Sequence, residues 1–388
     1  MPIAIAEEHR MLQSLVAKFV DNELLPLEPT VLAREASGQA VRLTESEEDA
    51  LLSKCREVGL WGLDVPEELG GADLPAVARM GVHEELGRTI TPFLFPPDSP
   101  DLQMLLATAN EGQRKRYLEP YARGQTRAAI AASEPGAGAD PAGMKTRAVK
   151  DGDSWVINGR KIWISFVKEA DFTILMALTD PVKKARGGIT AFIVEKETPG
   201  FHIGREIPML AGARTYEVIL ENCRLHDDQV LGKVGDGFGP MQLRFNVRRL
   251  EMGAWCIGMA RRALDMMTEH ARLRVTFGAP LAERQAIQWW VADAATNIHA
   301  CRLMVMDAAA RLDVGEDIRT VSSMVKVFST EMATEVIDNA MQAFGAMGMT
   351  KEMPLQQMAQ RVRLMRIFEG PSEVHRMAIA RRILNVKH

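Results

Sequence analysis

Glu369 is a candidate general base, because its carboxylate follows two apolar residues, Ile367 and Phe368. Apolar surroundings disfavour the charged form of a carboxylate and make it a stronger proton acceptor. The same residues, 369–372 (EGPS), are also typical of a helix end followed by a new helix with proline at an early position. From these residues alone, both the catalytic and the structural interpretation stay open.

Arg244, Arg248 and Arg249 form a basic cluster that is a candidate anion site. The formal net charge of -4 gives no reason to expect a general polyanion-binding surface, so nucleic acid is not expected as a partner. The Gly-rich stretch 231–240 lacks the Lys-Ser/Thr pair of a P-loop and does not follow the order of strand, GxGxxG and helix. We interpret it as a flexible connector rather than a phosphate-binding loop.

The cysteines indicate neither a metal site nor a disulfide framework. Cys55, Cys223, Cys256 and Cys301 lie far apart and form no CxxC pair, so we expect no metal and four reduced, buried thiols. The N-terminus has no basic region before an apolar stretch, and no segment of about 18 apolar residues follows. We therefore expect a soluble, cytoplasmic protein that does not cross a membrane.

The spacing of apolar residues divides the 388-residue chain into helical, strand-rich and again helical parts. Residues 7–121 show helical periodicity, strand-like runs begin near 128, and Asn158-Gly159 predicts a hairpin turn within 154–164. Further strands are expected at 172–178, 189–194 and 216–220, and helices at 241–273, 283–312, 318–346, 355–366 and 372–385. We predict an α+β fold with an N-terminal all-α domain (1–127), a central β-barrel-like or sandwich domain (128–236) and a C-terminal four-helix bundle (237–388).

Five stretches occur in the order, and at about the spacings, of the motifs of the FAD-dependent acyl-CoA dehydrogenase family. They are residues 133–140 (SEPGAGAD), 157–165 (INGRKIWIS), 274–278 (RVTFG), 342–348 (QAFGAMG) and 367–371 (IFEGP). One such stretch would be weak evidence, whereas five in register over nearly the whole chain make the resemblance specific. The chain therefore resembles that family, which has the same order of domains.

The resemblance implies an FAD site. Ser133 falls where a hydroxyl faces the flavin, and Trp163 and Ser165 fall where a Trp-Ile-Thr/Ser segment lines the isoalloxazine ring. Arg274 is similar to an arginine that reaches the FAD pyrophosphate of a neighbouring subunit. The other expected cofactor contacts are Phe277, Gln285, Gln342, Gly345 and Glu373. Without the resemblance, the same residues suit a turn, a core indole and a solvated helix end.

The resemblance also implies a reaction. Glu369 would abstract the α-proton of an acyl-CoA thioester, and hydride would pass from the β-carbon to flavin N5, giving the trans-2-enoyl-CoA. The thioester oxygen would accept hydrogen bonds from the Glu369 amide and a ribityl hydroxyl. Gly370 would allow close approach of the backbone. The other expected substrate contacts, Asn246, Arg249 and Arg381, are each also typical of a polar helix surface.

The expected partners are an acyl-CoA substrate, electron-transfer flavoprotein as electron acceptor, and further copies of the chain in a homotetramer built as a dimer of dimers. Two alternatives remain. The same fold could act as an acyl-CoA oxidase or a nitroalkane oxidase, although the latter uses Asp as its base. A flavin-binding protein without CoA chemistry would resemble the related DNA-damage response flavoproteins, which carry a long basic C-terminal extension; this sequence ends soon after Glu369.

Several positions depart from the family pattern. Ala139 replaces the usual Ser before the Asp of the first motif, and Phe166 replaces a small or amide residue beside the flavin. Ala346, Pro371 and Glu373 differ near the adenosine end of FAD. The last motif resembles the subgroup related to large, multidomain eukaryotic members, which often has Asp as base, whereas this chain has Glu369.

Overall fold

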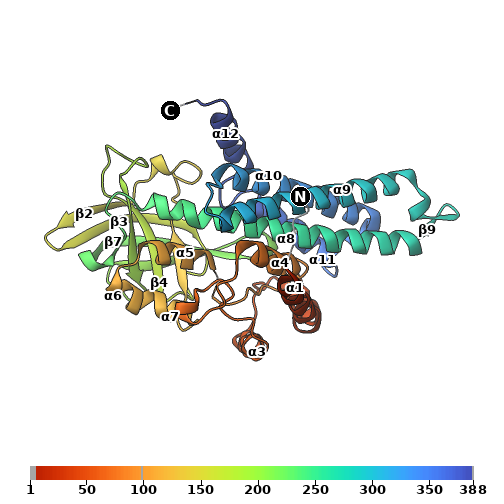
Figure 1. Cartoon of the computed structure of the whole chain (residues 1–388), viewed down its shortest axis with the longest axis horizontal. Helices are drawn as coiled ribbons and strands as arrows, with labels where there is room; N and C mark the ends of the chain where they lie inside the picture. Colours follow the sequence, from red (N-terminus) through yellow and green to blue (C-terminus); the bar gives the residue numbers. More distant parts are fainter. Residues whose placement is uncertain (1–5, 98, 387–388) are drawn as a thin grey trace.

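The computed structural model describes residues 6–97 and 99–386. A group of N-terminal helices is followed by a sheet and then by long C-terminal helices, as Figure 1 shows. This order confirms the predicted fold class. In the described part of the chain, no helix is both long enough and apolar enough to cross a membrane.

The N-terminal helices are α1 (Glu7–Phe19), α2 (Glu28–Ala36), α3 (Glu45–Glu57), α4 (Ala76–Leu86), α5 (Ser99–Thr108), α6 (Glu111–Gln113) and α7 (Glu119–Ala122). The strands are β1 (Ala128–Ala131), β2 (Arg147–Asp151), β3 (Ser154–Ile164), β4 (Phe172–Leu178), β5 (Ile189–Glu195), β6 (Phe201–Pro208), β7 (Arg214–His226) and β8 (Val230–Leu231). The C-terminal elements are α8 (Phe238–Leu273), β9 (Val275–Thr276), β10 (Ala279–Pro280), α9 (Gln285–Asp313), α10 (Arg319–Phe344), α11 (Pro354–Met365) and α12 (Ser372–Ile383).

Partly buried ion pairs dock the N-terminal helices on α8. Arg262 donates from Nη1 and Nη2 to the two carboxylate oxygens of Glu28 in α2, at 2.6 and 2.7 Å. Arg261 donates to Glu84 and Glu85 of α4, at 2.8 and 2.9 Å. Forked guanidinium–carboxylate contacts constrain direction as well as distance. They therefore fix the orientation of α8, which carries part of the candidate site.

Strands β1 to β8 form one mixed sheet in the order β6-β7-β3-β2-β4-β5-β8, with β1 parallel to β4, and β9 and β10 form a separate hairpin. The predicted turn at Asn158-Gly159 is wrong, because β3 continues through both residues. The hairpin turn lies earlier, at Gly152, between β2 and β3. Gly159 lies instead at a register shift against β7, where a Cβ would be 2.4 Å from Thr146 Oγ1. Asn158 Oδ1 accepts the Asn222 N–H at 2.8 Å. The Asn-Gly pair therefore forms a β-bulge here and not a turn.

The Gly-rich stretch forms the predicted connector between the sheet and α8. Gly237 N donates to the carbonyl oxygen of Ile189 at 2.9 Å, and Gly235 N donates to Thr190 Oγ1 at 2.8 Å. Both partners belong to β5. The connector is thus held on the sheet before α8 begins.

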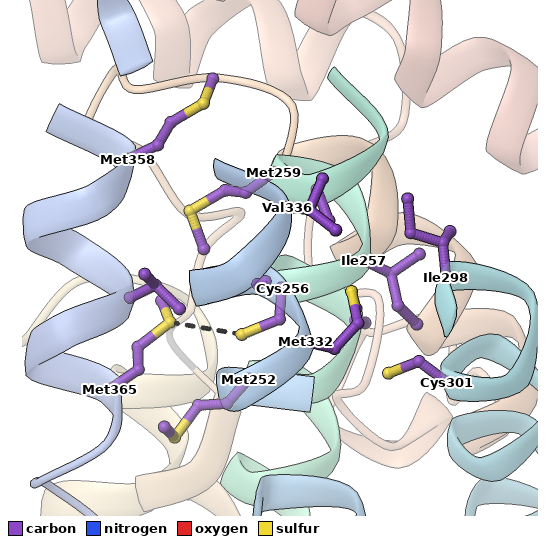
Figure 2. Close-up of a cluster of buried hydrophobic side chains, with 14 of the residues drawn as sticks. Met252, Cys256, Ile257, Met259, Ile298, Cys301, Met332, Val336, Met358 and Met365 are labelled. Carbon is purple, nitrogen blue, oxygen red and sulfur yellow. Dashed lines mark hydrogen bonds between the residues drawn. The ribbon is translucent and has the colours of Figure 1, made fainter. Parts of the chain in front are cut away.

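Methionine and cysteine side chains fill much of the core between α8, α9, α10 and α11. Met252, Cys256 and Met259 of α8 lie with Met332 of α10 and Met365 of α11 (Figure 2). Cys256 Sγ is 3.8 Å from Met365 Sδ. Flexible thioethers suit the irregular spaces between long helices. All four cysteines are buried and free, as the sequence predicts.

A buried ion pair joins the loop after β1 to strand β3. Lys161 is fully buried and donates to Glu134 Oε1 at 2.9 Å and to the Ala132 carbonyl oxygen at 3.1 Å. The Glu134 carboxylate also accepts the backbone N–H groups of Lys145 at 2.6 Å and Thr146 at 2.9 Å. Every polar atom of this pair therefore has a partner inside the fold, as buried charges require.

Burial and charge act in opposite directions on the two groups of this pair. Burial lowers the pKa of Lys161 to about 8, against the opposing attraction of Glu134. For Glu134, burial would raise the pKa, but Lys161 and the hydrogen-bond donors outweigh it, so the pKa lies below its ordinary value. The pair fixes the segment of Ser133 beside that of Trp163, because Ile162 N also donates to the Ser133 carbonyl oxygen at 3.0 Å.

We predict that Lys161→Met destabilises the protein by about 3–5 kcal/mol, because Glu134 keeps a buried charge without its cation. The double variant Lys161→Met/Glu134→Gln should recover part of this loss. Urea unfolding followed by circular dichroism measures the difference. Arg224→Ala is the control on the same sheet, since Arg224 pairs with Asp151 at the surface and exposed pairs contribute little. Equal effects of Lys161→Met and Arg224→Ala would contradict the prediction.

Candidate functional site

Glu369 lies in the short turn between α11 and α12, in a left-handed backbone conformation. The φ angle is 56° at Glu369 and 96° at Gly370. A non-glycine residue is uncommon there and costs on the order of 1–3 kcal/mol, so surrounding contacts must hold it. A Cβ on Gly370 would lie 2.8 Å from His375 Nε2. The turn, rather than either helix, therefore sets the direction of the Glu369 side chain.

Three side chains from three helices hold the carbonyl groups of this turn. Arg249 Nε of α8 donates to the Glu369 oxygen at 3.2 Å, and His375 Nε2 of α12 lies 3.1 Å from the same oxygen. Lys326 Nζ of α10 donates to the Gly370 oxygen at 2.5 Å. Lys326 is fully buried, and Arg249 and His375 are nearly so. The left-handed turn is therefore stabilised by polar contacts from α8, α10 and α12.

His375 is a neutral donor with a defined tautomer. The Glu369 carbonyl can only accept, so Nε2 carries the proton, and Nδ1 of the neutral ring lies 3.0 Å from the Ser323 hydroxyl oxygen. Burial, together with the positive charges of Arg249 and Lys326, lowers the pKa of His375 to about 4. The imidazole thus has a fixed structural bond at neutral pH.

The Glu369 carboxylate has two different oxygens. Oε1 accepts Nη1 of Arg244 at 2.9 Å, and Nε of Arg244 donates to Asp101 Oδ1 of α5 at 2.7 Å. Oε2 is buried and has no hydrogen-bond partner within residues 6–97 and 99–386. One oxygen is therefore held in place while the other is available to accept a proton.

The expected apolar environment of Glu369 is wrong. The side chains of Ile367 and Phe368 are 54% and 42% exposed, and the carboxylate contacts Arg244 instead. The reason is the backbone, because a residue in the left-handed conformation directs its side chain differently from the preceding residues of the same turn. Adjacency in sequence therefore did not identify what surrounds the carboxylate.

Burial and charge act in opposite directions on the cations of this site. Burial lowers the pKa of Arg249 to about 10, although Glu369 raises it. Burial, followed by repulsion from Arg249, lowers the pKa of Lys326 to about 8. For Arg244, Glu369 and Asp101 outweigh burial, and the pKa lies above its ordinary value. All three cations are charged at neutral pH.

The expected substrate residues lie in two places. Asn246 is buried beside Arg249, and its Oδ1 accepts from Ser322 Oγ at 3.0 Å and from Arg249 Nη1 at 3.4 Å. This brings Asn246, Arg249 and the Glu369 turn together. Arg381 lies near the end of α12, partly exposed, and no hydrogen bond or ion pair of this side chain with Glu369 is seen among the described residues.

A second group of expected residues forms a surface beside the sheet. Trp163 is 49% exposed and left-handed, with φ 63°, and Ser165 is exposed beyond it. Ser133 is partly exposed on the neighbouring segment. Phe166 is also left-handed, with φ 61°, and exposed. An open indole bordered by hydroxyl groups suits a planar heterocycle, so these residues fit the flavin that the resemblance implies.

A third group lies at the far end of the long helices. Arg274 and Phe277 belong to the β9–β10 hairpin, which Figure 1 places at the opposite end of α8 from the sheet. Phe277 is 99% exposed, and Arg274 and Gln285 are exposed too. Gln342 and Gly345, exposed at the end of α10, complete the group. One chain therefore does not bring this group to Trp163.

The sequence did not identify Asp101, Ser323, Lys326 and His375 as site residues. Each lies on a different element from its partner, and Asp101 is 143 positions from Arg244. The basic cluster did point to Arg244 and Arg249, but not to the group that each would contact. No local signal could have supplied these pairings.

Comparison with known proteins gives consistent results along the whole chain. The N-terminal, middle and C-terminal domain models of acyl-CoA dehydrogenases match residues 6–125, 129–223 and 235–384. (R)-Benzylsuccinyl-CoA dehydrogenase of Thauera aromatica is 41% identical over 99% of this chain and 97% of its own. Butyryl-CoA dehydrogenase from Megasphaera elsdenii has a TM-score of 0.89 at 27% identity, over 99% of this chain and 100% of that chain. A structure described as electron transferring flavoprotein of Acidaminococcus fermentans has a TM-score of 0.87 at 30% identity, over 100% of both chains. The chain therefore belongs to the acyl-CoA dehydrogenase family and is an FAD-dependent oxidoreductase.

Proposed function

We propose that this protein catalyses the α,β-dehydrogenation of an acyl-CoA thioester to the trans-2-enoyl-CoA, with Glu369 as the base. The observation that carries the proposal is the asymmetry of the Glu369 carboxylate. Arg244 holds Oε1, while Oε2 is buried and unpartnered among the described residues. A base needs one fixed geometry and one free lone pair, and this side chain supplies both.

The residues of the turn perform the proton transfer in this proposal. Glu369 receives the α-proton on Oε2, and its backbone N–H donates to the thioester oxygen, where negative charge develops. Arg249, His375 and Lys326 hold the carbonyl groups of Glu369 and Gly370 and keep both peptide units fixed. FAD, when bound, takes up the hydride that leaves the β-carbon.

We assign the cofactor contacts to the two exposed groups. Ser133, Trp163 and Ser165 would border the flavin ring, and the hairpin group with Arg274 would bind the pyrophosphate and adenosine of a neighbouring chain's FAD. Glu373, exposed on α12, belongs to the same proposed adenosine region. A dimer is then the smallest complete unit, and we propose a homotetramer built as a dimer of dimers.

We also propose the partners of the reaction. Electron-transfer flavoprotein is the proposed acceptor, a choice supported by the similarity to the Acidaminococcus fermentans structure. The relative from Thauera aromatica is named for benzylsuccinyl-CoA. The acyl-CoA thioesters to be tested as substrates therefore include benzylsuccinyl-CoA as well as short, long, branched and aromatic ones. The proposed substrate contacts are still Asn246, Arg249 and Arg381. The proposal for Asn246 and Arg249 is supported by their position beside the Glu369 turn.

We expect Glu369→Gln to keep its yellow FAD and to lose on the order of 100-fold or more in the rate of flavin reduction, because an amide cannot accept the α-proton. Anaerobic loss of the flavin's visible absorbance after mixing with each acyl-CoA measures that rate. Glu197→Gln makes the same chemical change at an exposed turn and should reduce as fast as the wild type. A near-normal rate in Glu369→Gln would remove Glu369 from its role.

Arg274→Ala should purify with less FAD per chain, because a forked contact to a diphosphate is lost across a subunit boundary. Flavin absorbance relative to protein gives the occupancy, and light scattering gives the assembly. Arg272→Ala is the matched control, since Arg272 is equally exposed two residues earlier in the last turn of α8. Unchanged occupancy in Arg274→Ala would refute the assignment.

A further inference from the structure

Arg244 contacts the reacting carboxylate but plays no part in fixing the backbone of the turn. Arg249 and Lys326 bind carbonyl oxygens, whereas Arg244 donates hydrogen bonds to the side chains of Glu369 and Asp101. The side chains of Arg244, Asp101 and Glu369 are each 12% exposed. Arg244 is therefore a nearly buried cation in direct contact with the proposed base.

The guanidinium retains donors beyond these two bonds. An arginine has five N–H groups, and the bonds to Asp101 and Glu369 use one on Nε and one on Nη1. A planar fork of this kind matches the geometry of a carboxylate and can share its edges between several acceptors. Arg244 can therefore accommodate a further oxygen ligand without leaving Asp101.

The charges around Glu369 become unbalanced when Glu369 is protonated. The cations Arg244, Arg249 and Lys326 face the carboxylates of Glu369 and Asp101, and Glu373 also acts on Lys326. Buried charge is costly unless it is compensated. When Glu369 takes up a proton, one of these negative charges is lost, and among the described residues Arg244 keeps only Asp101 as an anionic partner. A carboxylate on the bound substrate would compensate that charge throughout the reaction.

We infer that Arg244 binds a free carboxylate on the acyl group, so that the substrate is the CoA monothioester of a short dicarboxylic acid. This inference rests on the proposed function, because it assumes that Glu369 reaches the α-carbon. Arg244 lies one hydrogen bond from that base, so the carboxylate must be attached close to the reacting carbons, as in a succinyl group. A carboxylate at the far end of a long chain would not reach Arg244.

The test compares two thioesters that differ in one group: benzylsuccinyl-CoA, and the same thioester with its free carboxylate converted to a primary amide. Anaerobic flavin reduction gives kcat/KM for each with the FAD-bound protein. We expect the wild type to prefer the carboxylate on the order of 10- to 100-fold, as charge-assisted hydrogen bonds do. In Arg244→Gln, both thioesters should reduce the flavin with similar kcat/KM. Arg244→Lys should keep part of the preference for the carboxylate thioester.

Two results would overturn the inference. The first is equal kcat/KM of the wild type for the two thioesters, which needs no variant and so does not depend on how Arg244→Gln folds. The second is an Arg244→Gln variant that loses rate equally with both, which would make Arg244 only a positioning residue for Glu369. Either result leaves the proposed function intact as long as the amide thioester bleaches the flavin, whereas no bleaching by any acyl-CoA would reject the proposed function itself.

Discussion

The left-handed turn at Glu369 and Gly370 is the constraint around which the C-terminal part is organised. A glutamate does not adopt this conformation without support, and the support comes from buried polar groups on three different helices. Those groups must in turn be paired, because an unpaired buried donor or charge is destabilising. Helix packing, the tautomer of His375 and the direction of the Glu369 side chain are thus parts of one arrangement.

In the sheet, too, buried charged groups are paired with each other and with backbone groups. Lys161 and Glu134 are buried side by side, and their bonds to backbone groups fix two segments that carry expected cofactor residues. In both regions a buried charged residue determines the position of a neighbouring, partly exposed residue. The positions of Ser133, Trp163 and Glu369 therefore depend on a framework of buried polar groups beneath them.

The sequence predicted much of the fold because periodicity is a local property. The C-terminal helices lie within three residues of their predicted ends, and the expected strands are present. The failures concern backbone conformation and contacts between distant segments. Asn158-Gly159 suits a bulge as well as a turn, and only the pairing of β3 with β7 distinguishes them. Glu369 could be recognised by its motif, but its contact with Arg244, and that of Arg244 with Asp101, depends on how α5, α8 and the last turn meet.

Helix α8 contains 36 residues and so extends for about 54 Å. Arg244 and Arg249 lie in its first part, and Arg274 directly follows its last residue. A continuous helix cannot fold back, so the two ends cannot face the same small molecule. In the proposed arrangement each chain would lend the far end of this helix to another chain's cofactor. Complete sites would then form only as chains associate, and mass action would tie the fraction of working protein to its concentration.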